Sequence, residues 1–206
     1  MYKFPIIFIF IIFLIPKSIF AEDISVYEIE GISIGDNLLD FLSKDEVLKS
    51  IKITKNHYSN LREPNKYAEI YYRKNLKKYD FVSIFIKFPI SNIFLSKKNE
   101  KFTVLTIRGG INFINDMEGC LNQRNKLIRN FRNHLVNARQ KSQVNKHPLD
   151  PSGKSFYDII AFKFKNGDSL ELSCNDWEET FRNKRKFSEG FNLALFTKDV
   201  SEWMSN

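Results

Sequence analysis

The sequence predicts a single α+β domain, built as an antiparallel sheet with helices packed on one face. Three observations predict this fold class. Hydrophobic residues make up 43% of the chain and include 20 phenylalanines, enough for a packed core. Strand-like runs follow one another closely, as in antiparallel meanders. Each half of the chain reads as a helix followed by about three strands, so two helix-plus-three-strand units can share one sheet.

Residues 1–21 have the pattern of a secretory signal peptide. Lys3 precedes an apolar run over residues 4–15, and Ala21 is the small residue expected before a cleavage site. The run is shorter than the roughly 20 residues that a membrane span needs, although an uncleaved anchor is the alternative. We therefore expect residues 22–206 to form one soluble domain, periplasmic or secreted. The chain has no Asn-x-Ser/Thr acceptor, which favours a bacterial periplasm.

Two short helices are expected over residues 31–51. Asp36 is the expected N-cap of the first, and Ser43 with Glu46 forms a capping box for the second. Strand-like runs follow at residues 67–72, 80–88 and 102–108. The pair Gly109-Gly110 is then expected to form a tight turn into residues 111–114.

The longest helical pattern begins at Asn115 and continues to about Arg139. Apolar residues fall on a stripe about 120° wide along this pattern. Its members are Met117, Cys120, Leu121, Leu127, Ile128, Phe131, Leu135 and Ala138. Residues 140–154, with two prolines and a glycine, are expected to form a loop.

Residues 155–165 and 169–175 predict a hairpin around Asn166-Gly167. A two-residue turn would set Phe162 against Glu171 and mismatch the apolar faces. A three-residue loop, with Gly167 in the left-handed region, pairs Phe162 with Leu170 and Asp158 with Cys174. We predict the second register. A last strand is expected at residues 190–197, before a short segment that contains Trp203.

Cys120 and Cys174 are the only cysteines, and both lie at positions patterned to face the core. In an oxidising compartment such a pair is expected to form a disulfide, with two buried free thiols as the alternative. Arg124 lies in the same apolar stripe, and Asp158 is its candidate partner for a buried ion pair. The alternative for Arg124 is a side chain that reaches solvent at the edge of the stripe.

The formal charge of the chain is +8, and +6 after removal of residues 1–21, and one basic tract invites an anionic ligand. Residues 121–149 contain seven Lys or Arg and no acid. Candidate anion-binding residues in this tract and in a second basic cluster are Lys126, Arg129, Arg132, Arg182, Lys184, Arg185 and Lys186. The first three spread around the helix, which favours an ordinary solvated surface, and export argues against nucleic acid. The Gly153-Lys154-Ser155 run lacks the first glycine of a phosphate loop, because Pro148 stands there, and predicts a turn.

No catalytic residue, metal ligand set or cofactor is predicted. His57, His134 and His147 have no metal-ligand spacing and suggest no triad. The leading hypothesis is a non-catalytic binding or interaction module that uses an aromatic sheet face with Tyr71, Phe81 and Phe85 exposed. One alternative is a periplasmic hydrolase or isomerase whose site is assembled from distant residues. Another is an envelope-associated protein held by its basic surface. The expected partner is an envelope protein or an anionic envelope component.

Several short segments resemble an uncharacterised family of small exported bacterial proteins. They are YEIEGISIGD at residues 27–36 with Leu38-Leu39, Gly110-Ile111 before Cys120, Ser152-Gly153-Lys154-Ser155, and Gly167-Asp168 before Cys174-Asn175-Asp176-Trp177. The resemblance implies one exported domain and supplies no catalytic residue. The opening segment also looks like small outer-membrane assembly lipoproteins and beta-lactamase-inhibitor modules, although this chain has no lipid-bearing cysteine near residue 21.

Overall fold

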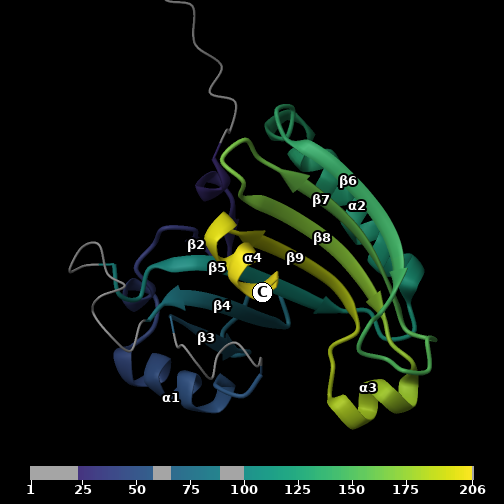
Figure 1. Ribbon diagram of the computed structural model, residues 1–206, viewed down its shortest axis with the longest axis horizontal. Coiled ribbons are helices and arrows are strands. Elements are labelled where there is room, and N and C mark those ends of the chain that lie inside the picture. Colours follow the sequence, from purple (N-terminus) through teal and green to yellow (C-terminus); the bar gives the residue numbers. More distant parts are fainter. Residues whose placement is uncertain (1–22, 58–65, 89–99, 206) are drawn as a thin grey trace, which may run out of the picture.

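The computed structural model describes residues 23–57, 66–88 and 100–205, so the predicted leader lies outside the described residues. Its main feature is a seven-stranded antiparallel sheet of order β3-β4-β5-β9-β8-β7-β6 (Figure 1). The strands are β3 (Tyr67–Tyr72), β4 (Phe81–Lys87), β5 (Val104–Asn112), β6 (Arg139–Lys146), β7 (Phe156–Lys163), β8 (Ser169–Asp176) and β9 (Gly190–Phe196). A two-stranded hairpin, β1 (Glu28–Ile29) and β2 (Ile32–Ser33), stands apart from this sheet. The α+β prediction is confirmed.

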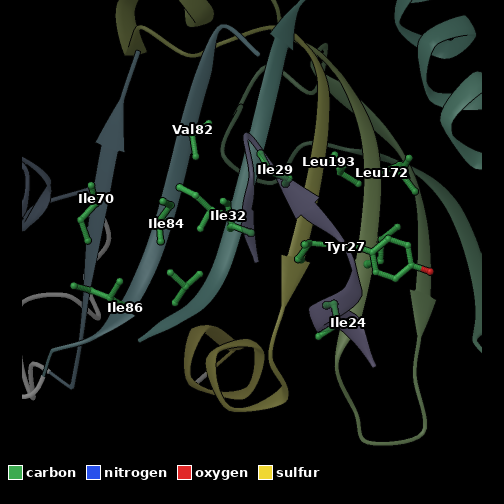
Figure 2. Packing of buried hydrophobic residues seen from close by; sticks show 14 of the residues in the cluster. Ile24, Tyr27, Ile29, Ile32, Ile70, Val82, Ile84, Ile86, Leu172 and Leu193 are labelled. Carbon is green, nitrogen blue, oxygen red and sulfur yellow. The ribbon is translucent and has the colours of Figure 1, made fainter. Parts of the chain in front are cut away.

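One face of the sheet, which we call the inner face, carries the main hydrophobic core. It is covered by η1 (Ile24–Val26), by the β1–β2 hairpin and by α2 (Met117–Phe131), which packs on β8 and β9. Figure 2 shows Ile29 and Ile32 of the hairpin lying over Ile84 of β4 and Leu193 of β9. The core forms because alternate residues of these strands are apolar and point to the same side.

The opposite face, which we call the open face, is covered only in part. The C-terminal helix α4 (Lys198–Ser205) crosses it, in front of the central strands in Figure 1. Val200 of α4 packs against Tyr67 and Phe85, and the Trp203 ring meets the Tyr67 ring edge-on at 5.0 Å. This helix is an addition to the predicted arrangement, in which helices occupy one face. From the sequence we expected only a short segment containing Trp203 after the last strand, with no helix assigned to it.

Helix α1 (Lys44–Thr54) lies along the free edge of β3 and satisfies part of its backbone. The Ser50 hydroxyl accepts from the Tyr71 N–H at 2.9 Å and donates to the Tyr71 carbonyl at 3.3 Å. The Thr54 hydroxyl donates to the Glu69 carbonyl at 2.5 Å. One serine and one threonine side chain thus form the hydrogen bonds that a further strand would form at this edge.

The predicted hairpin register is confirmed. Phe162 pairs with Leu170, and Asp158 pairs with Cys174, in the β7–β8 ladder. The Phe164 N–H donates to the Asp168 carbonyl, and Gly167 has φ of +95°, as the three-residue loop requires.

The turn predicted at Gly109-Gly110 is wrong, because β5 runs through both glycines without interruption. A Cβ added at Gly110 would lie 2.1 Å from the Phe81 ring, and one at Gly109 would lie 2.6 Å from the Tyr79 ring. These glycines therefore allow two rings to lie directly on the strand. Chain reversal is not their role.

The helix predicted to continue to Arg139 is shorter in the structure. Helix α2 ends at Phe131 and is followed by a 3-10 turn, η5 (Arg132–His134). The loop predicted over residues 140–154 is also wrong at its start, since β6 occupies Arg139–Lys146. Every residue of β6 except Gln143 is exposed, so both faces of the strand are solvated. The sequence therefore lacks the alternation of apolar and polar residues by which a strand is predicted.

The helix caps differ in part from their predictions. Ser43 and Glu46 form the expected capping box of α1. The N-cap of η2 (Leu38–Asp40) is Asn37, where the sequence predicted Asp36. The Asp36 carboxylate instead accepts from the Ser33 N–H at 2.8 Å. Helix α2 begins after Asp116, one residue later than expected. Short polar side chains in sequence compete for the same N–H groups, which makes such boundaries uncertain by a residue.

The two predicted units differ in the structure. The first, α1 with β3, β4 and β5, has the expected helix and three strands. The second has four strands, because β6 adds to the three that were predicted. Its last strand, β9, follows α3 (Glu179–Arg185), lies between β8 and β5, and joins the two halves into one sheet. Within the described ranges, every helix is too short or too polar to cross a bilayer.

Candidate functional site

The predicted disulfide joins α2 to the sheet. Cys120 and Cys174 are bonded, with their Cα atoms 5.9 Å apart, and both side chains are fully buried. The link fastens α2 to β8, on the inner face.

Arg124 and Asp158 lie together beside this disulfide. Arg124 is 6% exposed, and its Nη1 lies 2.6 Å from Asp158 Oδ1 and 3.1 Å from the Asp158 carbonyl oxygen. Its Nη2 lies 3.3 Å from Asp158 Oδ2. The carboxylate thus meets the guanidinium through both of its oxygens. The disulfide and the ion pair together hold α2 on the sheet, and we assign both to stability.

The structure does not gather the predicted anion-binding residues. Lys126 and Arg129 line a shallow open depression of about 450 Å³ on the outer side of α2. Arg132 is exposed in η5, while Lys184, Arg185 and Lys186 belong to α3 and its cap, which lie below α2 in Figure 1. The set is therefore dispersed over separate elements.

Arg182 is incorrect as an anion-binding candidate. Its side chain is buried, and its Nη1 lies 2.5 Å from Oε2 of Glu189, which is itself buried. Glu189 also accepts from the Asn115 N–H at 2.6 Å, which ties the start of α2 to the segment before β9. The Arg182 guanidinium is neutralised inside the protein and is not available to a ligand.

The aromatic docking surface that the sequence suggested is wrong for Phe81 and Phe85. Phe81 is 4% exposed and stacks under the Tyr71 ring at 5.5 Å, and Phe85 is 3% exposed beneath the Trp203 ring. Both side chains point to the open face as predicted, but neighbouring rings and α4 cover them. Only Tyr71 keeps part of its surface accessible.

The uncovered part of the open face lies over β5, β9, β8 and β7. Directly paired residues in antiparallel strands project to the same side, so the ladder registers define its rows. We call the following residues the open-face patch: Arg108, Ala194, Glu171 and Ala161 in one row, and Asn192, Ser173 and Ile159 in the next. All but the buried Ala194 are partly exposed.

Arg108 is the cation of this patch, and its hydrogen bonds are incomplete. Its Nε is buried and has no hydrogen-bond partner among the described residues. The guanidinium carbon lies 5.8 Å from the centroid of the Phe81 ring, which holds the plane of the group by a cation–π contact. The buried Thr106 hydroxyl, next along the same strand face, likewise has no partner in the described parts of the chain. Both atoms are shielded from solvent, so any contact from outside falls to the accessible part of the Arg108 side chain.

Glu171 is the acid of the patch and is held apart from Arg108. It lies two strands away in the same row, with Ala194 between them, so about 10 Å separates the two strands. Its carboxylate accepts from the Ser169 hydroxyl at 3.4 Å, and no described residue forms an ion pair with it. Burial raises the pKa of Glu171. The row thus presents a cation and an acid on either side of a small side chain.

A second polar cluster joins Ser83, Glu69 and His57. Glu69 is 2% exposed and accepts from the Ser83 hydroxyl at 2.6 Å, while its other oxygen lies 2.8 Å from His57 Nδ1. A serine nucleophile needs the imidazole on the hydroxyl, with the carboxylate behind it. Here the carboxylate stands between the two, and Ser83 is 2% exposed. This order does not support acyl transfer.

The Gly153-Lys154-Ser155 segment closes a turn around Asp150. The Asp150 carboxylate accepts from the N–H and the hydroxyl of both Ser152 and Ser155, at 2.7 to 2.9 Å. These bonds hold the pKa of Asp150 well below its usual range, against the effect of desolvation. A carboxylate at the centre of the turn repels phosphate, so the segment is structural.

No protein-family model, no curated protein and no solved structure matches this chain. The resemblance of its short segments to exported bacterial proteins therefore stays a prediction. Sequence reasoning missed Arg108 because it ended the strand at this residue. The available signal was a charged side chain at an alternating position of an otherwise apolar run.

Proposed function

We propose that this protein is an exported, non-catalytic binding module that docks a partner protein on the open-face patch. The observation that carries the proposal is Arg108, a half-buried cation with no ion-pair partner among the described residues. Arginine is enriched at the energetic centres of protein interfaces, where a ring commonly orients it. The Phe81 ring does so here.

The remaining residues of the patch suit a protein surface. Ile159 and Ala161 offer apolar contact, and Asn192 and Ser173 offer hydrogen bonds from short side chains. Such a mixture of apolar and polar groups is typical of interfaces between separately folded proteins. The group that best completes Arg108 is a carboxylate of the partner, because it matches the guanidinium in charge and geometry.

Export is part of the proposal. The leader pattern over residues 1–21 and the Cys120–Cys174 bond both fit an oxidising compartment. The intact mass of the protein recovered from cells tests this point. We expect loss of residues 1–21 and a gain of about two daltons on reduction. An uncleaved, reduced chain would contradict export.

Site-specific crosslinking in living cells tests the docking surface. A photoreactive residue replaces Asn192 in the patch and, as a control, Lys52 on the exposed side of α1. We expect a crosslinked partner protein from position 192 and none from position 52. In the Arg108→Ala background, the yield of the product crosslinked from position 192 should fall at least about tenfold. The matched control, Arg73→Ala, should leave that yield unchanged. Arg73 also stacks on the Tyr71 and Phe81 rings, but it lies outside the patch.

Three outcomes would overturn the proposal. Equal crosslinking from both positions would indicate contact without a dedicated surface. A product that survives Arg108→Ala would remove the residue on which the proposal depends. Salt-sensitive binding to anionic vesicles, with no protein product from position 192, would favour an envelope-associated protein held by its basic surface.

A further inference from the structure

The two edges of the sheet are treated differently. At the β3 edge, hydroxyls of Ser50 and Thr54 in α1 bond to the backbone, as described above. At the β6 edge, no described residue bonds to the backbone except β7, which pairs with β6 over its full length. In an antiparallel strand alternate residues direct their N–H and C=O groups away from the partner. Strand β6 therefore offers a row of unpaired groups.

Strand β6 also lacks most features that prevent pairing with another chain. It is eight residues long, it contains no proline, and its pairing with β7 has no bulge. Seven of its residues are exposed, including Val144 with 64% of its surface accessible. Its one protective feature is charge, from Arg139, Lys141 and Lys146.

That charge is unbalanced within the protein. Arg139 stands directly opposite Lys163 in the ladder, so two cations project to the same face at the corner of the sheet. Lys141 projects to this face as well. No described residue forms an ion pair with any of the three. Like charges directly opposite one another destabilise a sheet, and an acid beside them would relieve the repulsion.

We propose that β6 binds an extended acidic segment of a partner protein, which adds to the sheet as an eighth strand. Backbone hydrogen bonds would supply affinity, and alternate side chains would supply specificity. A second copy of this chain is a poor occupant, because its β6 carries the same three cations and no acid to balance Arg139 and Lys141. This inference goes beyond docking on the open-face patch and does not depend on it.

The side chains of β6 define the pattern of the segment. Arg139 and Lys141 project to the open face, and Val144 projects to the inner-face side. An antiparallel segment therefore carries an apolar residue and, three positions later, the first of two acids that are themselves two positions apart. The acids then meet Arg139 and Lys141, and the apolar residue meets Val144.

Fluorescence anisotropy with synthetic peptides tests the proposal on the purified, oxidised chain. The probe is a peptide of about ten residues, threonine-rich, with valine and two aspartates in that pattern. We expect saturable binding that weakens at least about tenfold when lysines replace the aspartates. The double variant Arg139→Glu/Lys141→Glu should reverse this preference. Lys126→Glu/Arg129→Glu, on the outer side of α2, is the matched control and should leave it unchanged.

N-methylation separates strand pairing from simple charge attraction. Methyl groups on alternate amides block one edge of the peptide, and methyl groups on the other alternate set block the opposite edge. A peptide paired with β6 should lose binding at least about tenfold with one set and keep it with the other. Equal binding of both methylated peptides, or no binding of the unmodified acidic peptide, would overturn the proposal. Either result leaves the crosslinking at position 192 to be judged by itself.

Discussion

Asp158 stands directly opposite Cys174 in the β7–β8 ladder, and its carboxylate meets Arg124 about one helical turn beyond Cys120. The covalent and the ionic links between α2 and the sheet are therefore adjacent. Each link joins one residue of α2 to one residue of the β7–β8 hairpin. This arrangement makes their separate contributions to stability measurable.

Removing Asp158 should destabilise the protein more than removing Arg124. Asp158→Ala leaves a buried guanidinium with only the residue 158 carbonyl to bond, at a cost of about 3 kcal/mol in the free energy of unfolding. Arg124→Met leaves a carboxylate whose side chain is 21% exposed and can be hydrated, so about 1 kcal/mol is expected. Urea unfolding of both variants checks the order. Equal losses would contradict it.

Loss of the disulfide should lower stability by about 4 kcal/mol, because the bond closes a loop of 54 residues in the unfolded chain. The double variant Cys120→Ala/Cys174→Ala, compared with the oxidised wild type in urea, measures this change. Wild-type protein under reductant should fall to nearly the same midpoint. An unchanged midpoint in both would show that packing around α2 is sufficient alone.

A methyl group at Gly110 should be destabilising. The added Cβ would lie 2.1 Å from the Phe81 ring, which has neighbours on its other side, so about 1–3 kcal/mol is expected for Gly110→Ala. A second substitution, Phe81→Leu, removes the obstructing ring and should recover part of the loss. Thermal unfolding of the single and double variants gives the comparison. Additive losses would count against a steric cause.

Asp150 should make the protein sensitive to acid. Because hydrogen bonds hold the folded-state pKa of Asp150 below its ordinary value of about 3.9, the unfolded chain binds the proton more readily. The contribution of Asp150 is therefore complete above about pH 4 and is lost as the pH falls through the depressed folded value. Asp150→Asn should flatten the loss of stability below pH 4, and the exposed Asp45→Asn should not. Parallel acid profiles would refute this role.

Glu171 should act in the opposite sense. Burial raises its folded-state pKa, so the folded protein binds the proton more readily, and stability falls as the pH rises between the ordinary and the raised values. At pH 7 the charged carboxylate is a cost, and Glu171→Gln should raise the melting temperature. The gain should vanish below about pH 4, where the wild-type carboxyl is protonated in both states. The exposed Glu118→Gln serves as control and should show no such crossover.

Much of the fold follows from apolar periodicity in the sequence. The register of β7 and β8 could be predicted because only one pairing matches the apolar faces of Phe162 and Leu170. The disulfide and the candidate partner of Arg124 followed from that register. Strand β6 could not be predicted in the same way, because solvent on both faces leaves its sequence without a period.

The candidate site was less accessible to prediction, since it depends on contacts between distant residues. Nothing near Phe85 in sequence indicates that Trp203 of α4 covers it. The glycines at 109 and 110 have the composition of a turn, and only the rings of Tyr79 and Phe81 explain them. Arg108 gains its interest from an unmet hydrogen bond, which no sequence pattern displays.

Strand β9 is the last strand of the chain and yet the middle one of the sheet. A chain that appears N-terminus first, from a ribosome or across a membrane, therefore holds two incomplete meanders until residues 190–196 arrive. In that interval β5 and β8 each expose a long apolar edge that the finished molecule hides, and such edges invite wrong pairing. Newly made molecules thus depend on their final residues for protection, and a chain that stops short of Gly190 would be prone to aggregate.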